Sequence, residues 1–184
     1  MLNHIGTQTL ESERLILRAF AAKDAAAMFR NWASDPEVTK YLTWPAHKSE
    51  AVTQDILQEW VRSYENPQYY HWAIVCKENG SEPIGSIGVM TLDEQKKQAT
   101  VGYCLGRSWW HRGYMTEALK TVIDFLLYHV GVQKVAAWHD PRNLHSGAVM
   151  RNCGMVYEGT LYAADRNNQG ICDASWYAIW KRSE

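Results

Sequence analysis

The sequence has no surplus of charge of either sign, because 19 Lys and Arg residues stand against 20 Asp and Glu residues. A basic face of the kind that binds nucleic acid is therefore not indicated. No apolar run approaches the length of a membrane span, and the start of the chain carries Glu11, Glu13, Arg14 and Arg18 where a signal peptide is apolar. We expect a soluble cytoplasmic protein without a nucleic-acid or membrane partner.

Cysteine and histidine patterns that would indicate disulfides or metals are also missing. Cys76, Cys104, Cys153 and Cys172 form no C-x-x-C pair, and three of them lie in strand-like apolar runs. We therefore expect small reduced core residues. The seven histidines show no H-E-x-x-H or other paired ligand spacing, so we expect no metal site. The phosphate motifs G-x-x-x-x-G-K-[ST] and G-x-G-x-x-G are absent too.

The 184 residues are enough for one domain, which we expect to span residues 1–184 with its core at 12–181. Hydrophobic periodicity predicts an α+β fold, with a mixed and mostly antiparallel sheet of about six or seven strands flanked by about four helices. The expected strands cover residues 14–20, 70–77, 84–92, 100–105, 134–139, 155–162 and 172–181. The expected helices start at Asp24, Ser49, Gly113 and Asn143, and the strand 134–139 should pair parallel to the strand 100–105.

The chain is organised around residues 100–119, which predict a strand, a loop with glycine and the start of a helix. Val101, Tyr103 and Leu105 alternate along the strand, and Gly113 precedes the helix. A residue without Cβ lets the backbone approach a ligand closely, and the free N–H groups of a first helical turn favour an anion. The stretch is therefore interpreted as a phosphate-binding loop.

The run Trp110-His111-Arg112-Gly113-Tyr114-Met115, continued by Thr116-Glu117-Ala118, resembles the pyrophosphate loop of the GNAT superfamily of acetyl-CoA-dependent N-acetyltransferases. It is most similar to the branch of the ribosomal-protein N-terminal alanine acetyltransferases, in which Gly-x-Met-Thr-Glu-Ala is common. Trp110 and Met115 depart from the general family pattern Gln/Arg-x-x-Gly-x-Gly/Ala. The phrase from Ser12 to Arg18 also resembles the opening strand of that branch.

The resemblance implies acetyl-CoA as the co-substrate, with its diphosphate on the loop and its pantetheine arm along the central strand. The residues implied to bind it are Tyr103, Cys104, Leu105, Arg107, His111, Arg112, Gly113, Tyr114, Met115, Thr116, Asn143 and Ser146. Many relatives use a Tyr as general acid at the position of Met150, which donates no proton. The alanine-acetyltransferase branch uses a Ser, which matches Ser146, although a purely structural serine stays open there.

The general base is the open part of the implied mechanism. Relatives often carry a Glu at the start of the central strand, where this chain has Thr100. The remaining candidates are Asp165, which aligns with an acidic residue of the branch, then Glu158 and His139, and a chain of water molecules.

Four aromatic residues are placed where an acceptor would lie, and we expect Trp44, Tyr41, Trp109 and Tyr162 to wall its groove. Exposed aromatic residues are also typical of a dimer contact, so a homodimer stays open. The favoured function is acetyl transfer to a primary amine, with a protein N-terminal α-amine implied by the branch. A small-molecule amine acetyltransferase and a non-catalytic acyl-CoA-binding module remain alternatives.

Overall fold

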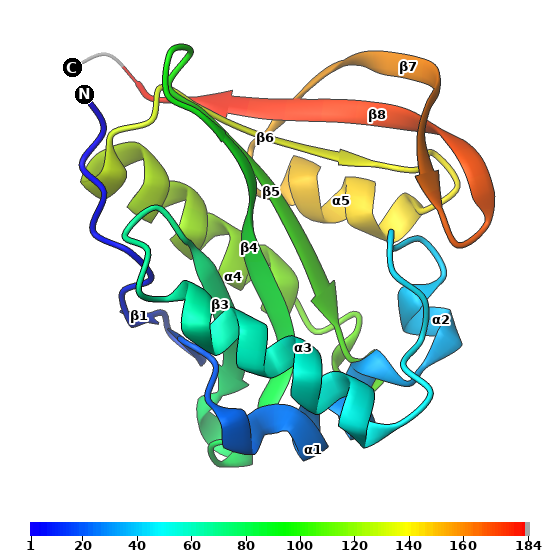
Figure 1. The fold of residues 1–184 in the computed structure, drawn as a ribbon. Helices are drawn as coiled ribbons and strands as arrows, with labels where there is room; N and C mark the ends of the chain where they lie inside the picture. Colours follow the sequence, from blue (N-terminus) through cyan, green and yellow to red (C-terminus); the bar gives the residue numbers. More distant parts are fainter. Residues whose placement is uncertain (183–184) are drawn as a thin grey trace.

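A twisted sheet of eight strands forms the centre of the computed structural model, which describes residues 1–182 (Figure 1). The strand order is β1-β2-β3-β4-β5-β6-β8-β7. All neighbouring strands pair antiparallel except β5 and β6, which are parallel as the sequence predicted. The α+β class is confirmed, and the sheet has more strands than the six or seven expected.

The strand boundaries differ from the prediction mainly at the two ends of the chain. The strands are β1 Leu10–Glu11, β2 Leu15–Arg18, β3 His71–Cys76, β4 Pro83–Asp93, β5 Gln98–Leu105, β6 Lys134–His139, β7 Val156–Asn167 and β8 Gly170–Trp180. β1 lies in a segment that was expected only to order against the first strand. The segment 165–170 was expected to be a loop, but the hairpin continues through it to a tight turn between Asn167 and Gly170.

Five α-helices flank the sheet: α1 Ala25–Met28, α2 Pro36–Thr39, α3 Glu50–Ser63, α4 Tyr114–Asp124 and α5 Leu144–Asn152. The single helix expected after Asp24 is divided, since a π-helical stretch, Phe29–Ala33, follows α1. Asp35-Pro36 ends that stretch and also begins α2, a helix that the sequence did not predict. The Asp35 carboxylate accepts a hydrogen bond from the Glu37 N–H at 2.9 Å, and Pro36 is suited to a first helical turn.

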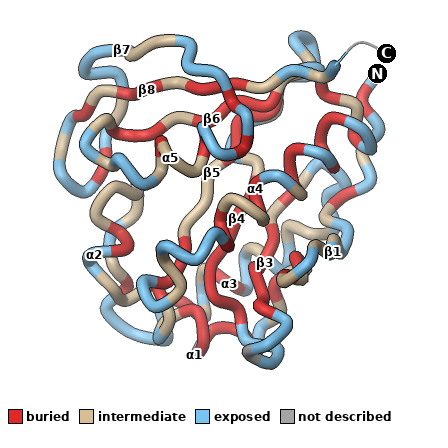
Figure 2. Tube along the Cα trace, turned by 180° about the vertical axis from the view of Figure 1, so that it is seen from behind, coloured by how far each residue is buried: buried red, intermediate tan, exposed pale blue. Residues whose placement is uncertain are grey.

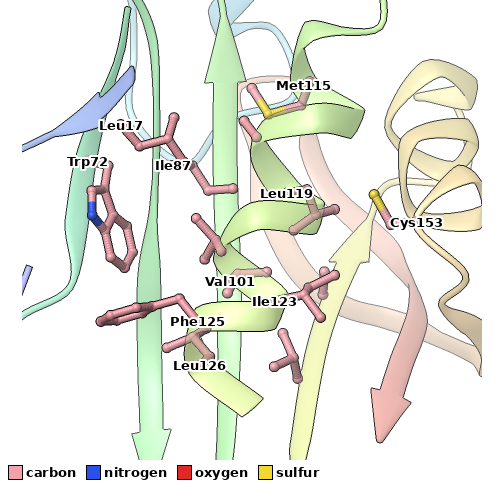
Figure 3. Close-up of a cluster of buried hydrophobic side chains, with 14 of the residues drawn as sticks. Leu17, Trp72, Ile87, Val101, Met115, Leu119, Ile123, Phe125, Leu126 and Cys153 are labelled. Atoms are coloured by element: carbon pink, nitrogen blue, oxygen red, sulfur yellow. The ribbon is translucent and has the colours of Figure 1, made fainter. Parts of the chain in front are cut away.

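The two faces of the sheet carry separate apolar layers. Met115, Leu119 and Ile123 of α4 belong to one buried cluster with Leu17 and Val101 of the sheet (Figure 3). This layer contains most of the buried residues, and Met150 and Cys153 extend it to α5. Figure 2 shows the central strands and α4 largely buried, whereas the outermost strand, β7, is mainly exposed.

A smaller layer covers the other face of the sheet, beneath α1 and α3. It contains Phe20, Met28, Trp32, Val38 and Leu57. Ala73 of β3 belongs to this layer, whereas its neighbours Trp72 and Ile74 belong to the α4 layer, as the alternation of a strand requires. In the described part of the chain, no helix is both long and apolar enough to cross a bilayer, and all four cysteines are free thiols.

His71 of β3 is held among aromatic rings under α3. Its ring lies edge-on to Trp60 with centroids 4.2 Å apart, and its Nδ1 is 3.0 Å from the Tyr69 hydroxyl. Burial lowers the pKa of His71 from 6.5 to about 4, because the charged ring would lose its hydration.

The depressed pKa of His71 predicts a pH-dependent stability. Below pH 6.5 the unfolded chain binds a proton at His71, whereas the folded chain does not until about pH 4. The free energy of unfolding should therefore fall as the pH is lowered from 6.5 to about 4. The contribution is fully present above pH 6.5 and amounts to about 3 kcal/mol at most. Urea unfolding should show a shallower fall in His71→Gln than in the wild type, and parallel pH profiles would contradict the assignment.

Candidate active site

β5 and β6 separate after a short paired stretch and leave part of β5 without a neighbour on that side (Figure 1). Only Gln98–Thr100 of β5 pairs with residues 134–136 of β6. The Gly106 N–H bonds to the Ile84 carbonyl of β4 at 2.8 Å. Because backbone groups alternate in direction along a strand, those of Tyr103 and Leu105 point into the opening. The Trp110 indole N–H donates to the Leu105 carbonyl at 2.7 Å. Within residues 1–182, no strand pairs with β5 at Tyr103 on this side, so Tyr103 lies at a free strand edge.

A cavity of about 600 Å³ lies beside this free edge. It is bounded by β5, the loop before α4, and two further stretches that we call the α2 wall, residues 37–42, and the α5 wall, residues 142–152. The residues that line it are Glu37, Val38, Lys40, Tyr41, Leu42, Tyr103, Cys104, Leu105, Trp109, Trp110, His111, Gly113, Tyr114, Met115, Thr116, Arg142, Asn143, Leu144, His145, Ser146, Ala148, Val149 and Asn152.

The loop before α4 has the geometry of an anion site. Gly113 caps the helix with φ of 78°, a left-handed conformation that a residue without Cβ adopts readily. His111 is also left-handed, with φ of 60°. The first amides of α4, an 11-residue helix, have no partners within the helix, and its dipole adds positive potential there. The loop therefore offers N–H groups to a phosphate at one end of the cavity.

Arg14, the residue before β2, connects this loop to the sheet. Its backbone N–H and its Nε each donate to the Glu117 carboxylate at 2.7 Å, and the Ser12 hydroxyl donates to the same carboxylate at 2.7 Å. Arg14 Nη1 donates to the Arg112 carbonyl at 3.0 Å, and the guanidinium lies 4.5 Å from the centre of the Tyr114 ring. Burial opposes ionisation of Glu117, but the bonds from Arg14 and Ser12 outweigh it and lower the pKa of Glu117.

The α5 wall brings a serine hydroxyl to the cavity. The Asn143 side chain accepts a hydrogen bond from the Ser146 N–H at 3.3 Å and so caps α5. The Tyr103 hydroxyl lies 3.1 Å from both the Ser146 carbonyl and the Ser146 Oγ. Burial raises the pKa of Tyr103, so its hydroxyl stays protonated and serves as a donor. Burial likewise raises the pKa of the Cys104 thiol to about 11, so this cavity residue is no thiolate near neutral pH.

The structure brings most of the sequence-predicted residues together. Those on the cavity surface are Tyr103, Cys104, Leu105, His111, Gly113, Tyr114, Met115, Thr116, Asn143, Ser146, Tyr41 and Trp109. Arg112 contributes only its carbonyl to the Arg14 contact described above, and its side chain does not line the cavity. Arg107 lies outside as well, because it pairs with Asp35 at 3.0 Å.

Two of the four acceptor aromatics are not on the cavity surface. The Trp44 ring packs against His47 with centroids 5.2 Å apart. Tyr162 sits in an irregular part of β7 with 82% of its surface exposed. The sequence could place both near the ends of elements, but it held no sign of the β7 irregularity that turns Tyr162 outward.

The three proposed basic side chains also lie outside the cavity lining. Glu158 forms an ion pair with Lys134 at 2.7 Å, and Asp165 accepts from the Arg166 N–H at 2.7 Å. His139 is buried with Nδ1 bonded to the Asp140 carbonyl, and burial lowers its pKa. Among the described residues that line the cavity, those with a carboxylate or imidazole side chain are Glu37, His111 and His145.

The sequence placed Tyr41 in the groove but did not predict the helix α2 beside it, and it indicated no role for the carboxylate of Asp140. Asp35-Pro36 was the available signal for α2, since an Asp followed by Pro is a common helix start. The Asp140 carboxylate accepts from Arg142 Nη2 at 2.6 Å, and this ion pair lowers the pKa of Asp140 to about 2. Residues 1–182 contain no group of three side chains suited to a metal ion.

Comparison with known proteins identifies the family to which the chain belongs. A family model described as an acetyltransferase (GNAT) domain matches residues 14–156. The uncharacterized N-acetyltransferase p20 of Bacillus licheniformis is 29% identical, over 95% of this chain and 97% of that protein. The ribosomal-protein-serine acetyltransferase of Escherichia coli is 26% identical, over 94% of this chain and 96% of that protein.

A solved structure shares the fold. The microcin C7 self-immunity acetyltransferase MccE, solved in complex with acetyl-CoA and AMP, superposes with a TM-score of 0.82. The match covers 92% of this chain and 93% of that chain. The sequences are 22% identical, so the similarity shows a shared fold.

The contacts of Glu117 predict a stability effect. Glu117→Gln keeps the shape of the side chain but removes the charge that three donors share, so the free energy of unfolding should fall by about 1–3 kcal/mol. Glu11→Gln is the matched control, because Glu11 is 65% exposed and its pair with Lys77 spans 3.2 Å; its effect should stay below about 0.5 kcal/mol. Equal losses in urea unfolding would contradict an anchoring role for Glu117.

Proposed function

Because the chain belongs to the GNAT acetyltransferase family and is an acetyl-CoA-dependent N-acetyltransferase, we propose that it acetylates the α-amine of a peptide or protein N-terminus. One observation carries the proposal: a single cavity joins an anion-binding helix start, a free strand edge and a serine hydroxyl. These are the three features that a thioester with a phosphate-bearing carrier needs.

The residues of the cavity divide naturally between the parts of acetyl-CoA. The amides from His111 to Thr116 suit its diphosphate, since they lie at the start of α4. The free edge at Tyr103 suits the amides of the pantetheine arm, which can pair with it as an added strand would. A backbone N–H at this edge also suits the oxyanion that forms when an amine attacks the thioester carbonyl.

Ser146 is proposed to protonate the departing thiolate. In this step the amine nitrogen bonds to the acetyl carbon, the carbon–sulfur bond breaks, and the thiolate takes a proton from the Ser146 hydroxyl or from water held by it. The proton that the amine nitrogen loses passes through water and restores the donor. Tyr103 is proposed to orient this serine. Its hydroxyl donates to the Ser146 carbonyl at 3.1 Å and also lies 3.1 Å from Ser146 Oγ, so it fixes the place of the serine hydroxyl at the cavity.

A protein N-terminus is favoured over a small amine by the relative that acetylates ribosomal protein, which this chain matches along almost its whole length. The cavity lining carries Glu37 but no cluster of acidic side chains, and Lys40 and Arg142 add positive charge. A polycationic amine would meet little attraction in such a site.

The substrate proposal is tested with a panel of acceptors. Peptides that begin with Ala, Ser or Met should release free thiol from acetyl-CoA faster than spermidine, an aminoglycoside or single amino acids do. The matched control is each peptide with a blocked α-amine, which should give only background hydrolysis. Faster turnover of a small amine than of every peptide would replace the proposed substrate class.

The proton-donor proposal predicts matched effects of two substitutions. Ser146→Ala should lower kcat about 100-fold with little change in the Kd for coenzyme A, because only the step that releases the thiolate is affected. Tyr103→Phe should lower kcat about tenfold, and the double variant should resemble Ser146→Ala, since Tyr103 acts through Ser146. Additive losses, or unchanged turnover in Ser146→Ala, would refute these roles.

A further inference from the structure

The turn of the β7–β8 hairpin is bonded directly to the α2 wall of the cavity, and through Asp140 to the start of the α5 wall. We call residues 167–170 the hairpin tip. The Asn168 amide nitrogen donates to the Thr39 carbonyl at 2.8 Å and to the Trp44 carbonyl at 2.7 Å. Its backbone N–H donates to the Leu42 carbonyl at 3.2 Å. One residue therefore satisfies three carbonyl groups in and beside the α2 wall, residues 37–42.

The neighbouring residue, Asn167, is connected to the α5 wall through Asp140. Asn167 is buried, and its amide nitrogen donates to the Asp140 carboxylate at 2.8 Å. Asp140 in turn accepts from the Arg142 backbone N–H at 2.9 Å and from the Arg142 guanidinium. Arg142 is the first residue of the α5 wall, so Asn167 fixes the position at which this wall begins.

The tip itself is rigid enough to act as a spacer. The Gln169 N–H donates to the Asn167 side-chain oxygen at 2.8 Å, so the second polar atom of that buried amide is also satisfied. Asn167 pairs with Gly170, which adopts φ of 101°, and the turn between them is two residues long. Adjacent residues of one tight turn therefore hold the two walls at a set separation.

We propose that the hairpin tip sets the width of the acceptor end of the cavity, with Asn168 as a positioning residue for the acceptor amine. This inference rests on the proposed function. The opposite end, where the phosphate loop lies, has a separate anchor in Arg14 and Glu117. Loss of the Asn168 bonds should accordingly affect acceptor binding and spare the binding of acetyl-CoA.

The test compares Asn168→Asp with Gln169→Ala. An aspartate keeps the size of Asn168 but faces the Thr39 and Trp44 carbonyls without a donor. Gln169 is the matched control, because it is the exposed neighbour and its side chain makes no hydrogen bond within residues 1–182. Asn168→Ala is a second variant, which removes the donor without adding a charge.

Two measurements are made on each variant: steady-state kinetics with the amine of highest turnover in the panel, and hydrogen exchange of the amides of residues 38–44. Both Asn168 variants should raise the KM for the amine about fivefold or more, while kcat and the KM for acetyl-CoA stay within about twofold. Amide exchange in residues 38–44 should accelerate in these variants and remain at the wild-type rate in Gln169→Ala.

The outcomes separate this inference from the proposed function. If the wild type acetylates no amine of the panel, the proposed function fails, and the exchange measurement alone decides whether the tip holds the α2 wall. Unchanged exchange in both Asn168 variants would overturn the inference. Equal increases in both KM values would overturn it too, since they would mark a general loosening of the fold.

Discussion

The early separation of β5 from β6 is the constraint on which the rest of the site depends. The two strands pair only over residues 98–100 and 134–136. Beyond that point, no strand within residues 1–182 pairs with this side of β5 at Tyr103, and backbone groups at such an edge call for a hydrogen-bond partner. A strand edge inside a cavity is costly in a finished sheet, yet it is the feature that an amide-bearing carrier can complete. The family's acetyl-CoA-dependent chemistry is therefore consistent with an incomplete sheet.

Three groups of contacts keep this incomplete sheet open and ordered. Arg14 and Glu117 hold the loop before α4 close to β2. Tyr103 connects β5 to the α5 wall through Ser146. The hairpin tip connects the α2 wall to the loop before α5. Each contact joins segments that are distant in sequence, and each is a hydrogen bond to a backbone group or to a charged side chain. Such bonds fix geometry more strictly than apolar packing does.

Patterns of neighbouring residues predicted much of the fold correctly. The parallel strand Lys134–His139 and the helix Leu144–Asn152 were predicted with their observed boundaries, because alternation, an Asn cap and a following glycine are signals within a few residues. The helix expected after Asp24 was divided, because packing of Met28 and Trp32 beneath α3 outweighs intrinsic helix preference there. α2 was missed although Asp35-Pro36 marks its start. The full length of β7 was also not predicted, because its exposed residues show no alternation of apolar and polar side chains.

The amino-acid sequence by itself determined the loop before α4, its glycine at positive φ and the serine in the first turn of α5, because each is encoded by neighbouring residues. Only the tertiary structure decided which polar groups share the cavity. It directed Arg107 to Asp35 and Glu158 to Lys134, and it brought Glu37 and His145 to the cavity instead. The physical reason is that a side chain's partner depends on long-range strand order and loop closure, which no local pattern records.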